Sequence, residues 1–522
     1  MSEQSDHDNM GALFAHALEL HQAGKLHEAE IIYGQVLALD DNHVNTLTCL
    51  GTLNLQQGHQ EAGIRLIGKS LELHPDQPHA HNNLGNAFRD LNRLDEALAS
   101  YDRALALRPD YAEAYNNRGI ALQFLNRLDE ALTSYDRALA LRPDYAEAYN
   151  NRGNALIGLK RQAEALASFD QAIALKPGYA EAYYNRGNAL NGLKRPAEAL
   201  ASFDQAIALN PGFAEAYNNK SLVKVLLGEY EEGWELYEWR WKVDEIKEFV
   251  RNFPKPLWLG KESLAGKTIL LHTEQGFGDS IQMYRYVPMV EALGAKVVLE
   301  VQQPLVGLIS TLKDSIRVIP RGSPLPEFDC HCPLMSLPLA FKTTVSTIPA
   351  KIPYLATDPN KQKQWQNRMG AKTKPQIGLV WSGAQIHKND HNRSIPLDML
   401  SPLLDLGLEF HCLQKEIRPA GRELLVKHHR IKTYENDLND FSDTAALVAQ
   451  MNLVISVDTS VAHLAGALGK PVWILLPFAS DYRWFMERED SPWYPTARLF
   501  RQPQIGDWTR VIEKVVAELK VL

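Results

Sequence analysis

The first half of this chain takes its fold from residues 93–126, RLDEALASYDRALALRPDYAEAYNNRGIALQFLN, and from their near copy at 127–160, RLDEALTSYDRALALRPDYAEAYNNRGNALIGLK. Each stretch is 34 residues long, and most positions are identical between the two. The same spacing of 34 continues on both sides in prolines and glycines: Pro75, Pro109, Pro143, Pro177 and Pro211, and Gly51, Gly85, Gly119, Gly153 and Gly187. A constant period of this length indicates a repeat array, in which each unit buries its apolar face only against its neighbours.

Each repeat is predicted to be two antiparallel helices. Small residues recur where the helix backbones must approach each other, an aromatic residue fills the space between them, and proline ends the second helix because it cannot continue one. These positions are Ala97, Ala131, Ala165 and Ala199, then Tyr101, Tyr135, Phe169 and Phe203, and then Ala104, Ala138, Ala172 and Ala206. The pattern resembles the tetratricopeptide repeat. Weaker copies flank the clear ones, so we expect six repeats and a degenerate seventh over residues 10–243, after a disordered tail at 1–9.

A ladder of asparagines follows the same period on the first helix of each repeat: Asn83, Asn117, Asn151, Asn185 and Asn219. Each asparagine amide offers two donors and an acceptor, which can pair with a peptide backbone of any sequence. The ladder resembles that of the eukaryotic protein O-GlcNAc transferases, and the resemblance implies that these asparagines bind an extended acceptor polypeptide. The alternative interpretation is that they are solvated or cap the local backbone. A solenoid presents a concave binding surface, which favours a protein partner.

Composition narrows the class of protein. The chain has 522 residues, which suits two or three domains, and a formal net charge of −8. Because no basic excess is available to displace counterions from phosphates, the charge argues against a nucleic-acid partner. The four cysteines include one close pair, Cys330 and Cys332, which would face the same side of a strand. Packing of reduced thiols is favoured there over a metal site.

The N-terminal residues are polar and acidic, so neither a signal peptide nor a transit peptide is predicted. The sequence has no run of about 18 apolar residues, the length that a membrane-spanning helix needs. The expected location is therefore the cytoplasm.

A compositional boundary follows the repeats. All ten tryptophans lie after residue 233, and Trp234, Trp239 and Trp241 cluster in the stretch GWELYEWRWK. This cluster is expected to cap the last repeat and dock the next domain, rather than to stack on carbohydrate. Residues 244–265 contain several prolines and glycines and are predicted to be a connector.

From Lys267 onward the pattern changes to alternating strands and helices. A strand at 268–272, a helix at 281–293 and a strand at 296–301 form one β-α-β unit. A second set comprises strands at 377–381, 409–413, 453–457 and 472–476, and helices at 444–450 and 460–468. We therefore expect two Rossmann-like lobes, 266–357 and 358–522, with parallel sheets and a substrate cleft between them. The turn GFGDSI is not a dinucleotide fingerprint, because Ile281 stands where the third glycine belongs.

Two segments of this region resemble the bacterial heptosyltransferases, which have two lobes in the GT-B fold and an inverting mechanism. The first is the turn at Gly278-Asp279 with the following helix and its Pro288, and the second is DFSDTAALVAQMNLVISVDTSVAHLAGALGKP, residues 440–471. The resemblance implies that Asp279 is the base for the acceptor hydroxyl. It further implies that the residues after Asp458 bind the donor diphosphate through backbone amides. On this basis the first lobe is the acceptor side and the second lobe is the donor side.

The residues of the second segment support an anion site on physical grounds. Asp458, Thr459 and Ser460 follow a strand and open a helix, where free backbone N–H groups and the helix dipole favour an anion. Thr459 and Ser460 add hydroxyl donors, Val461 adds a backbone amide, and His463 on the first turn can face the same cleft. The alternatives are a simple N-cap and a packed histidine.

Three further residues are donor-site candidates. Arg393, in the stretch NRSIP, stands where the heptosyltransferases have a lysine that contacts phosphate, and arginine can hold that charge with two hydrogen bonds. Gln414 and Lys415 follow the strand at 409–413, where this fold contacts the nucleoside. An Asp-x-Asp motif occurs only at residues 6–8, so no metal site and no cofactor is expected.

The combined prediction is an inverting, metal-independent glycosyltransferase that moves a sugar from a nucleotide-sugar to an acceptor, expected to be a protein recruited by the repeats. Two alternatives remain open: a heptosyltransferase-like enzyme that acts on lipid or glycan, and a non-catalytic repeat scaffold that binds nucleotide. The presence of Asp279 together with the constellation at 458–463 favours an enzyme. The sequence leaves the nucleotide base and the sugar undetermined.

Overall fold

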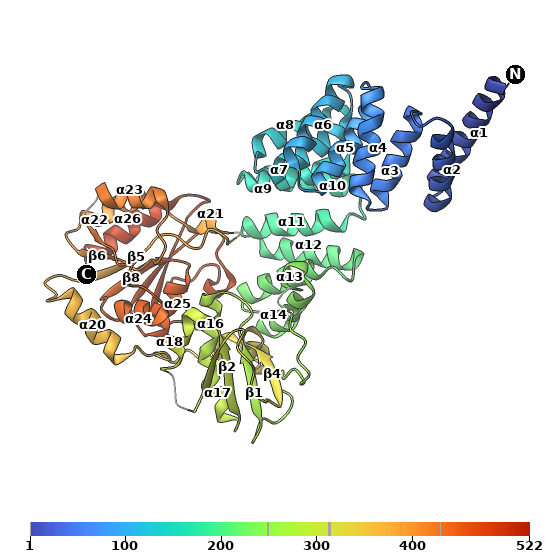
Figure 1. Ribbon diagram of the computed structural model, residues 1–522. Helices are drawn as coiled ribbons and strands as arrows, with labels where there is room; N and C mark the ends of the chain where they lie inside the picture. Colours follow the sequence, from blue (N-terminus) through green and yellow to red (C-terminus); the bar gives the residue numbers. More distant parts are fainter. Residues whose placement is uncertain (1, 248–249, 312–314, 388, 428–429, 522) are drawn as a thin grey trace. The chain divides into compact units, whose positions relative to one another are not determined.

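The computed structural model describes residues 2–247, 250–311, 315–387, 389–427 and 430–521 of the chain (Figure 1). The chain divides into two compact units, Met1–Leu190 and Asn191–Leu522. Within the described ranges, no helix combines the length and the apolar character that crossing a membrane requires.

The first unit is a solenoid of paired helices (Figure 1). The helices are α1 (Ser2–Gln22), α2 (Leu26–Leu39), α3 (Val44–Gln56), α4 (Gln60–Leu73), α5 (Pro78–Asp90), α6 (Leu94–Leu107), α7 (Ala112–Phe124), α8 (Leu128–Leu141), α9 (Ala146–Gly158), α10 (Gln162–Leu175) and α11 (Ala180–Gly192), the last of which extends past the end of the unit. Helix α1 packs on α2, α3 on α4, α5 on α6, α7 on α8 and α9 on α10. The predicted tetratricopeptide solenoid is confirmed.

The N-terminal tail differs from the prediction. Helix α1 begins at Ser2, so the segment predicted as a disordered tail at 1–9 is helical from its second residue. Farther along the same helix, Phe14 and Ala17 pack with Tyr33 of α2. This packing fixes the helix, and a helix that has already formed extends at little cost, so it propagates outward from the packed turns.

The recurring glycines lie where the two helices of one repeat approach closely. A Cβ placed on Gly119 in α7 would lie 2.5 Å from the ring of Tyr135 in α8, and the corresponding distance from Gly153 to Phe169 is 2.4 Å. Both rings are fully buried. A larger side chain would require a shift of the ring, so the glycine and the aromatic residue together set the spacing of the helices.

Consecutive helices are also joined by a charged ladder that the sequence alone does not reveal. Arg118 in α7 donates to Asp102 in α6 (Nε–Oδ1 2.7 Å) and to Ser134 in α8 (Nη1–Oγ 2.8 Å). One period later, Arg152 makes the same contact with Asp136 at 2.6 Å. Such half-exposed ion pairs contribute about 0–1 kcal/mol each to the free energy of unfolding. Apolar packing therefore remains the main source of stability in the solenoid.

The second unit starts with helices α12 (Pro196–Leu209), α13 (Ala214–Leu226) and α14 (Tyr230–Tyr237), followed by the 3-10 helix η1 (Glu238–Lys242). Trp234 is buried and meets Tyr237 and Tyr482 edge-on, with ring centroids 5.9 and 6.0 Å apart. Trp239 stacks on Tyr217 with centroids 3.8 Å apart. The tryptophan cluster therefore packs the end of the repeats and docks it on the α/β region, as predicted.

The first lobe contains a four-stranded parallel sheet in the order β3-β2-β1-β4. Its elements are β1 (Thr268–His272), β2 (Lys296–Val301), β3 (Arg317–Pro320) and β4 (Cys330–Pro333), with helices α16 (Phe277–Met283), α17 (Val287–Ala292), α18 (Val306–Ile309) and α19 (Leu337–Ala340). The single helix predicted at 281–293 is divided between α16 and α17. Pro288 explains the division, because proline lacks an N–H and clashes with the preceding turn. Cys330 and Cys332 are buried in the apolar core, as expected for packed thiols.

The connector predicted at 244–265 is packed against the first lobe. It begins with the short helix α15 (Asp244–Lys247). Phe253 then packs against Leu270 and Val298 on one face of the sheet, and the Trp258 backbone N–H donates to the oxygen of His331 at 2.8 Å. This segment covers part of a sheet face that helices would cover in a doubly wound fold.

The second lobe contains a six-stranded parallel sheet in the order β10-β9-β8-β5-β6-β7. Its strands are β5 (Gln376–Val380), β6 (Glu409–Cys412), β7 (Ile431–Lys432), β8 (Leu453–Val457), β9 (Val472–Leu476) and β10 (Ala497–Arg501). Its helices are α20 (Pro359–Met369), α21 (Asp390–Arg393), α22 (Ser401–Leu404), α23 (Pro419–Lys427), α24 (Phe441–Ala449), α25 (Ser460–Ala467) and α26 (Trp508–Leu519). The predicted α/β fold with parallel sheets is confirmed, and β7 and β10 are additions to it.

One continuous apolar core joins the two lobes. It contains Ile269 and Leu271 of β1 together with Leu464 of α25 and Ile474 of β9. Because every strand pair of the second lobe is parallel, the carboxyl ends of its strands meet at one edge. The loops after β5, β6, β8 and β9 leave the sheet at that edge and carry the candidate site.

Candidate donor-binding and catalytic site

The two segments that resemble the heptosyltransferases meet in the structure. A Cβ placed on Gly278, in the first turn of α16, would lie 2.8 Å from the ring of His463 and 3.5 Å from the Cα of Ser460. The start of α16 in the first lobe therefore touches the start of α25 in the second. Asp279 is the next residue of α16, so its carboxylate belongs to the same small region as the helix start that was predicted to bind an anion.

The start of α25 has the geometry of an anion site. Thr459 is the N-cap residue, with an extended backbone (φ −143°, ψ 170°), and in this described segment its side chain makes no capping bond. Its hydroxyl lies 3.1 Å from the hydroxyl of Ser456 instead. The first N–H groups of a helix have no acceptor within the helix itself, so those of Ser460 and Val461 can serve an anion.

Asp458 and His463 flank that helix start in a buried environment. Burial and then the charge of Asp481 raise the pKa of the Asp458 carboxyl. The His463 ring stacks on Trp484 with centroids 5.4 Å apart, and its Nδ1 is hydrogen-bonded to the hydroxyl of Tyr494 at 2.9 Å. Burial and nearby arginines hold the pKa of His463 well below its usual value. His463 is therefore a neutral, packed histidine, with Nε2 3.9 Å from Asp458 Oδ1.

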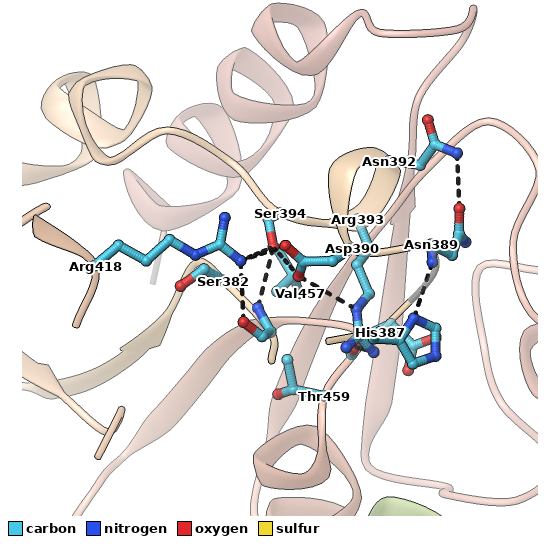
Figure 2. A network of polar contacts seen from close by, with 12 residues as sticks. Ser382, His387, Asn389, Asp390, Asn392, Arg393, Ser394, Arg418, Val457 and Thr459 are labelled. Atoms are coloured by element: carbon cyan, nitrogen blue, oxygen red, sulfur yellow. Dashed lines mark hydrogen bonds and ion pairs between the residues drawn. The ribbon is translucent and has the colours of Figure 1, made fainter. Parts of the chain in front are cut away.

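Arg393 ends the short helix α21 and brings a positive charge to the start of α25 (Figure 2). Its Nη1 donates to the backbone oxygen of Asp458 at 2.9 Å. Its guanidinium lies against Gly383, where a Cβ would come within 2.5 Å of Nη2. The side chain is 14% exposed, so the charge is held close to the protein and is only weakly screened by water.

A polar network that the sequence alone does not reveal holds the loop carrying Arg393 (Figure 2). Arg418, just before α23, forms an ion pair with Asp390 and donates to the backbone oxygen of Gly383 at 3.0 Å. Ser394 donates to Asp390 at 2.7 Å and accepts the Gly383 N–H at 3.1 Å. The loop after β5 is thereby tied to the loop after β6.

Gln414 and Lys415 are engaged with the protein's own groups. The side-chain oxygen of Gln414 accepts the backbone N–H groups of Trp381 and Ser382 at 2.7 and 3.1 Å, and its Nε2 donates to the Ser382 hydroxyl at 3.0 Å. These bonds join the end of β5 to the end of β6 and favour a structural role for Gln414 over a nucleoside contact. Lys415 is exposed and donates to the backbone oxygen of Asn439 at 2.8 Å.

Asp279 caps a helix and pairs with a cation at the same time. Its Oδ2 accepts the Gly276 N–H at 2.9 Å, which caps α16. Its Oδ1 forms an ion pair with Arg483, in the 3-10 helix η7 (Tyr482–Trp484). The carboxylate remains 21% exposed. Arg483 was not among the residues predicted from the sequence, because it lies 204 residues away from its partner and in no recognised motif.

The asparagine ladder bonds to the preceding helices of the solenoid. The bonds are Asn83 to the Thr52 hydroxyl (3.1 Å), Asn117 to Asn82 (3.1 Å), Asn151 to Asn116 (3.0 Å) and Asn185 to Asn150 (2.9 Å). In each case the ladder residue donates from Nδ2, so its carbonyl oxygen lies outside these bonds. Asn219, in the second unit, accepts from its neighbour Asn218 at 3.4 Å.

Comparisons with known families distinguish the two parts of the chain. Residues 85–123, 125–160 and 153–193 match the family described as TPR repeat, and residues 180–213 match the tetratricopeptide repeat family. Residues 439–480 match glycosyltransferase family 9 (heptosyltransferase). That stretch contains α24, β8, α25 and β9, and so includes the helix start at Thr459. The chain therefore carries tetratricopeptide repeats followed by an α/β region with a segment similar to family 9.

Among curated proteins, the chain is similar to Protein FlbA of Caulobacter vibrioides (strain ATCC 19089 / CIP 103742 / CB 15), with 27% identity over 330 residues. The similarity covers 58% of this chain and 54% of FlbA, so the chain spans about half the length of that relative. Among solved structures, it is similar to MamA, with 26% identity, 32% of this chain and 97% of MamA covered, and a TM-score of 0.30. It is also similar to YrrB, described as a TPR protein with an unusual peptide-binding site, with 24% identity, 36% and 98% coverage, and a TM-score of 0.32.

Proposed function

We propose that the second unit transfers a sugar from a nucleotide-sugar donor to an acceptor hydroxyl, with inversion at the anomeric carbon. The observation that carries the proposal is the contact between the starts of α16 and α25, where Gly278 lies against Ser460 and His463. This contact joins a carboxylate to a helix N-terminus suited to an anion. The match of residues 439–480 to glycosyltransferase family 9 supports the same class of reaction.

In this proposal the donor diphosphate binds at the start of α25. The N–H groups of Ser460 and Val461, the Thr459 hydroxyl and the Arg393 guanidinium would offset the charge that builds on the leaving diphosphate. Asp279 would accept the proton of the acceptor hydroxyl as its oxygen bonds to the anomeric carbon and the bond from that carbon to the diphosphate oxygen breaks. General-base assistance of this kind contributes roughly 100- to 10,000-fold in rate.

The remaining donor-side residues are proposed to act around this centre. Asp458 and His463 pack behind the helix start and fix its position, since His463 is buried and the Asp458 side chain is only 17% exposed. Gln414 shapes the loop after β5 from its buried position. Lys415 is exposed at the end of β6, where a nucleoside would be reached.

The acceptor is proposed to be a polypeptide held by the repeats. The ladder residues Asn117, Asn151 and Asn185 are half-buried and use an Nδ2 donor within the solenoid. Their carbonyl oxygens can accept backbone N–H groups from a chain of any sequence. A lipid or glycan acceptor is the alternative, and the sugar-bearing product distinguishes the two.

A second candidate is a scaffold that binds nucleotide without turning it over. It is favoured by one observation, namely that both oxygens of Asp279 already accept bonds, from Gly276 and from Arg483. While these bonds persist, neither oxygen is free to take the proton of an acceptor hydroxyl. If the chain is an enzyme, Asp279 must be released from Arg483 during turnover. If the chain is a scaffold, the ion pair between them can persist.

The test combines donor consumption with product analysis. The purified chain is incubated with ADP-, UDP- and GDP-sugars and a protein lysate, and mass spectrometry detects hexose, heptose or N-acetylhexosamine on protein, lipid or glycan. We expect protein-linked sugar, and a loss of roughly 100- to 10,000-fold in rate for Asp279→Asn. Asp405→Asn is the matched control, because Asp405 is 70% exposed and pairs with Arg430 outside the site. Nucleotide binding without donor consumption would support the scaffold, and an unchanged rate for Asp279→Asn would remove the base assignment.

A further inference from the structure

Arg483 lies at the point where the proposed donor and acceptor sides meet. Its side chain is 9% exposed, and it belongs to the loop that follows β9. One guanidinium nitrogen, Nη2, pairs with Asp279, while Nη1 lies 2.8 Å from Asp481 Oδ1 and Nε donates to Gln282 Oε1 at 2.6 Å. Two carboxylates and one amide therefore hold a single buried cation.

The same side chain is close to the start of α25. Trp484, the next residue, stacks on His463 in the first turn of that helix. The charge of Arg483 also acts on both residues that flank the anion site: it opposes the rise in the pKa of Asp458 and contributes to the fall in the pKa of His463. A guanidinium carries five N–H donors, and the three bonds named above use three of them, so Arg483 can bind a further acceptor.

We infer that Arg483 is a diphosphate-binding residue that Asp279 and the donor share. A diphosphate at the start of α25 competes with Asp279 for the guanidinium. As the donor binds, Asp279 loses its partner and its Oδ1 becomes free to accept the proton of the acceptor hydroxyl, so donor binding itself prepares the carboxylate. This inference rests on the proposed function and adds to it a reason why Asp279 is paired with Arg483 in this structure.

The charges around the site show how the sharing of Arg483 can be tested. The charged groups around the site include the carboxylates Asp279, Asp458 and Asp481 and the cations Arg393 and Arg483, with the Asp390–Arg418 pair beside Arg393 and the buried Arg285 near His463. A diphosphate brings further negative charge to this cluster, so a carboxylate that occupies Arg483 opposes its binding. Removing the charge of Asp279 should therefore tighten diphosphate binding, and most of that gain should depend on Arg483 being present to receive the ligand.

The experiment is a double-mutant cycle with inorganic pyrophosphate as the probe, measured by isothermal titration calorimetry on the full chain. The proteins are the wild type, Asp279→Asn, Arg483→Gln and the double variant. We expect Arg483→Gln to weaken binding by roughly tenfold or more, the loss that corresponds to one hydrogen bond to a charged group. Asp279→Asn should tighten binding in the wild-type background and have a much smaller effect beside Arg483→Gln. Arg488→Gln is the matched control, because Arg488 follows on the same loop, is 44% exposed and pairs with Asp490.

Every outcome of this cycle either supports or overturns the sharing of Arg483 between Asp279 and the diphosphate. An equal effect of Asp279→Asn in both backgrounds, or an Arg483→Gln variant that binds like Arg488→Gln, would overturn the sharing of Arg483 while leaving the donor site intact. Failure of pyrophosphate and of ADP, UDP and GDP to bind the wild type would overturn the donor site and the inference with it. Because Arg483 is buried between carboxylates, Arg483→Lys is the second variant: it keeps the charge, loses the planar fork, and should bind more tightly than Arg483→Gln and more weakly than the wild type.

Discussion

Replacing Arg240 by methionine tests the link between the last repeat and the turn that carries Asp279. The Arg240 side chain is fully buried; it pairs with Glu238 at 2.6 Å and with Glu274 at 3.1 Å, and it donates to the Ser336 hydroxyl at 2.7 Å. Glu274 is 2% exposed and precedes Asp279 by five positions. Methionine keeps most of the aliphatic stem and removes the charge, so Glu274 is left in the core without its cation.

We expect Arg240→Met to lower the free energy of unfolding of the second unit by about 3–5 kcal/mol at pH 8, the range for removing one partner of a buried ion pair. Burial raises the pKa of the Glu274 carboxyl from 4.5 to about 7, although Arg240 opposes the shift. A group whose pKa is raised in the folded state contributes stability below its unfolded pKa and loses it as the pH rises through the folded value. Without Arg240 that folded pKa rises further. The loss of stability should therefore be smaller at pH 5 than at pH 8.

Tryptophan fluorescence during urea unfolding is the assay, because all ten tryptophans belong to the second unit. Arg422→Met is the matched control: Arg422 is 59% exposed and pairs with Glu435, and such pairs contribute at most about 1 kcal/mol. Adding Glu274→Gln to Arg240→Met should abolish most of the pH dependence. A loss below about 1 kcal/mol at pH 8, or an equal loss at both pH values, would refute the reasoning.

Three further predictions concern the solenoid, the first lobe and the donor site. Gly119→Ala should destabilise the first unit by about 1–3 kcal/mol, because its methyl group meets the fixed ring of Tyr135. Gly68→Ala is the matched control: a Cβ at Gly68 would meet nothing within 4 Å, so this variant should stabilise the first unit by up to about 1 kcal/mol. Urea unfolding followed by circular dichroism measures the free energy of unfolding of both variants. A change of the same sign in the two would contradict the packing argument. Burial lowers the pKa of His272 from 6.5 to about 3, so its contribution to stability is present above pH 6.5 and is lost as the pH falls, with a slope of up to about 1.4 kcal/mol per pH unit. Thermal unfolding followed by tryptophan fluorescence should show this slope, and His272→Phe should reduce it. Arg393→Ala should weaken nucleoside diphosphate binding by roughly tenfold in a calorimetric titration, and unchanged affinity would remove Arg393 from the donor site.

The elements that follow from short-range patterns could be predicted from the sequence. Strand β8 forms at Leu453–Val457 and β9 at Val472–Leu476, the predicted limits, because continuous apolar runs bounded by turn residues define buried strands locally. The period of 34 residues likewise predicts where the helices of each repeat begin and end. The division of the predicted helix 281–293 was missed, although Pro288 in its interior marks the point where a continuous helix is disfavoured; in the structure Pro288 stands in the first turn of α17, where proline is tolerated.

The candidate site could be predicted only in part. The positions of Asp279 and of the helix start at Thr459 follow from motifs in which neighbouring residues act together. The partner of Asp279 does not, because Arg483 is brought to it by the packing of one lobe on the other. The role of Gln414 also depends on contacts across two strands, with Trp381 and Ser382, that its position after β6 does not indicate. Long-range pairing of this kind decides which polar side chains are available to a ligand.

Hydrogen–deuterium exchange with nucleoside diphosphates tests the central claim most directly, namely that an anionic donor binds at the start of α25 beside Asp279. With whichever of ADP, UDP or GDP binds, the backbone amides of residues 459–463 and 276–283 should exchange more slowly. The amides of α26, which packs against α22 and β10, should be unaffected and serve as the internal control. Binding that slows exchange elsewhere in the second unit and leaves residues 459–463 unchanged would contradict the account.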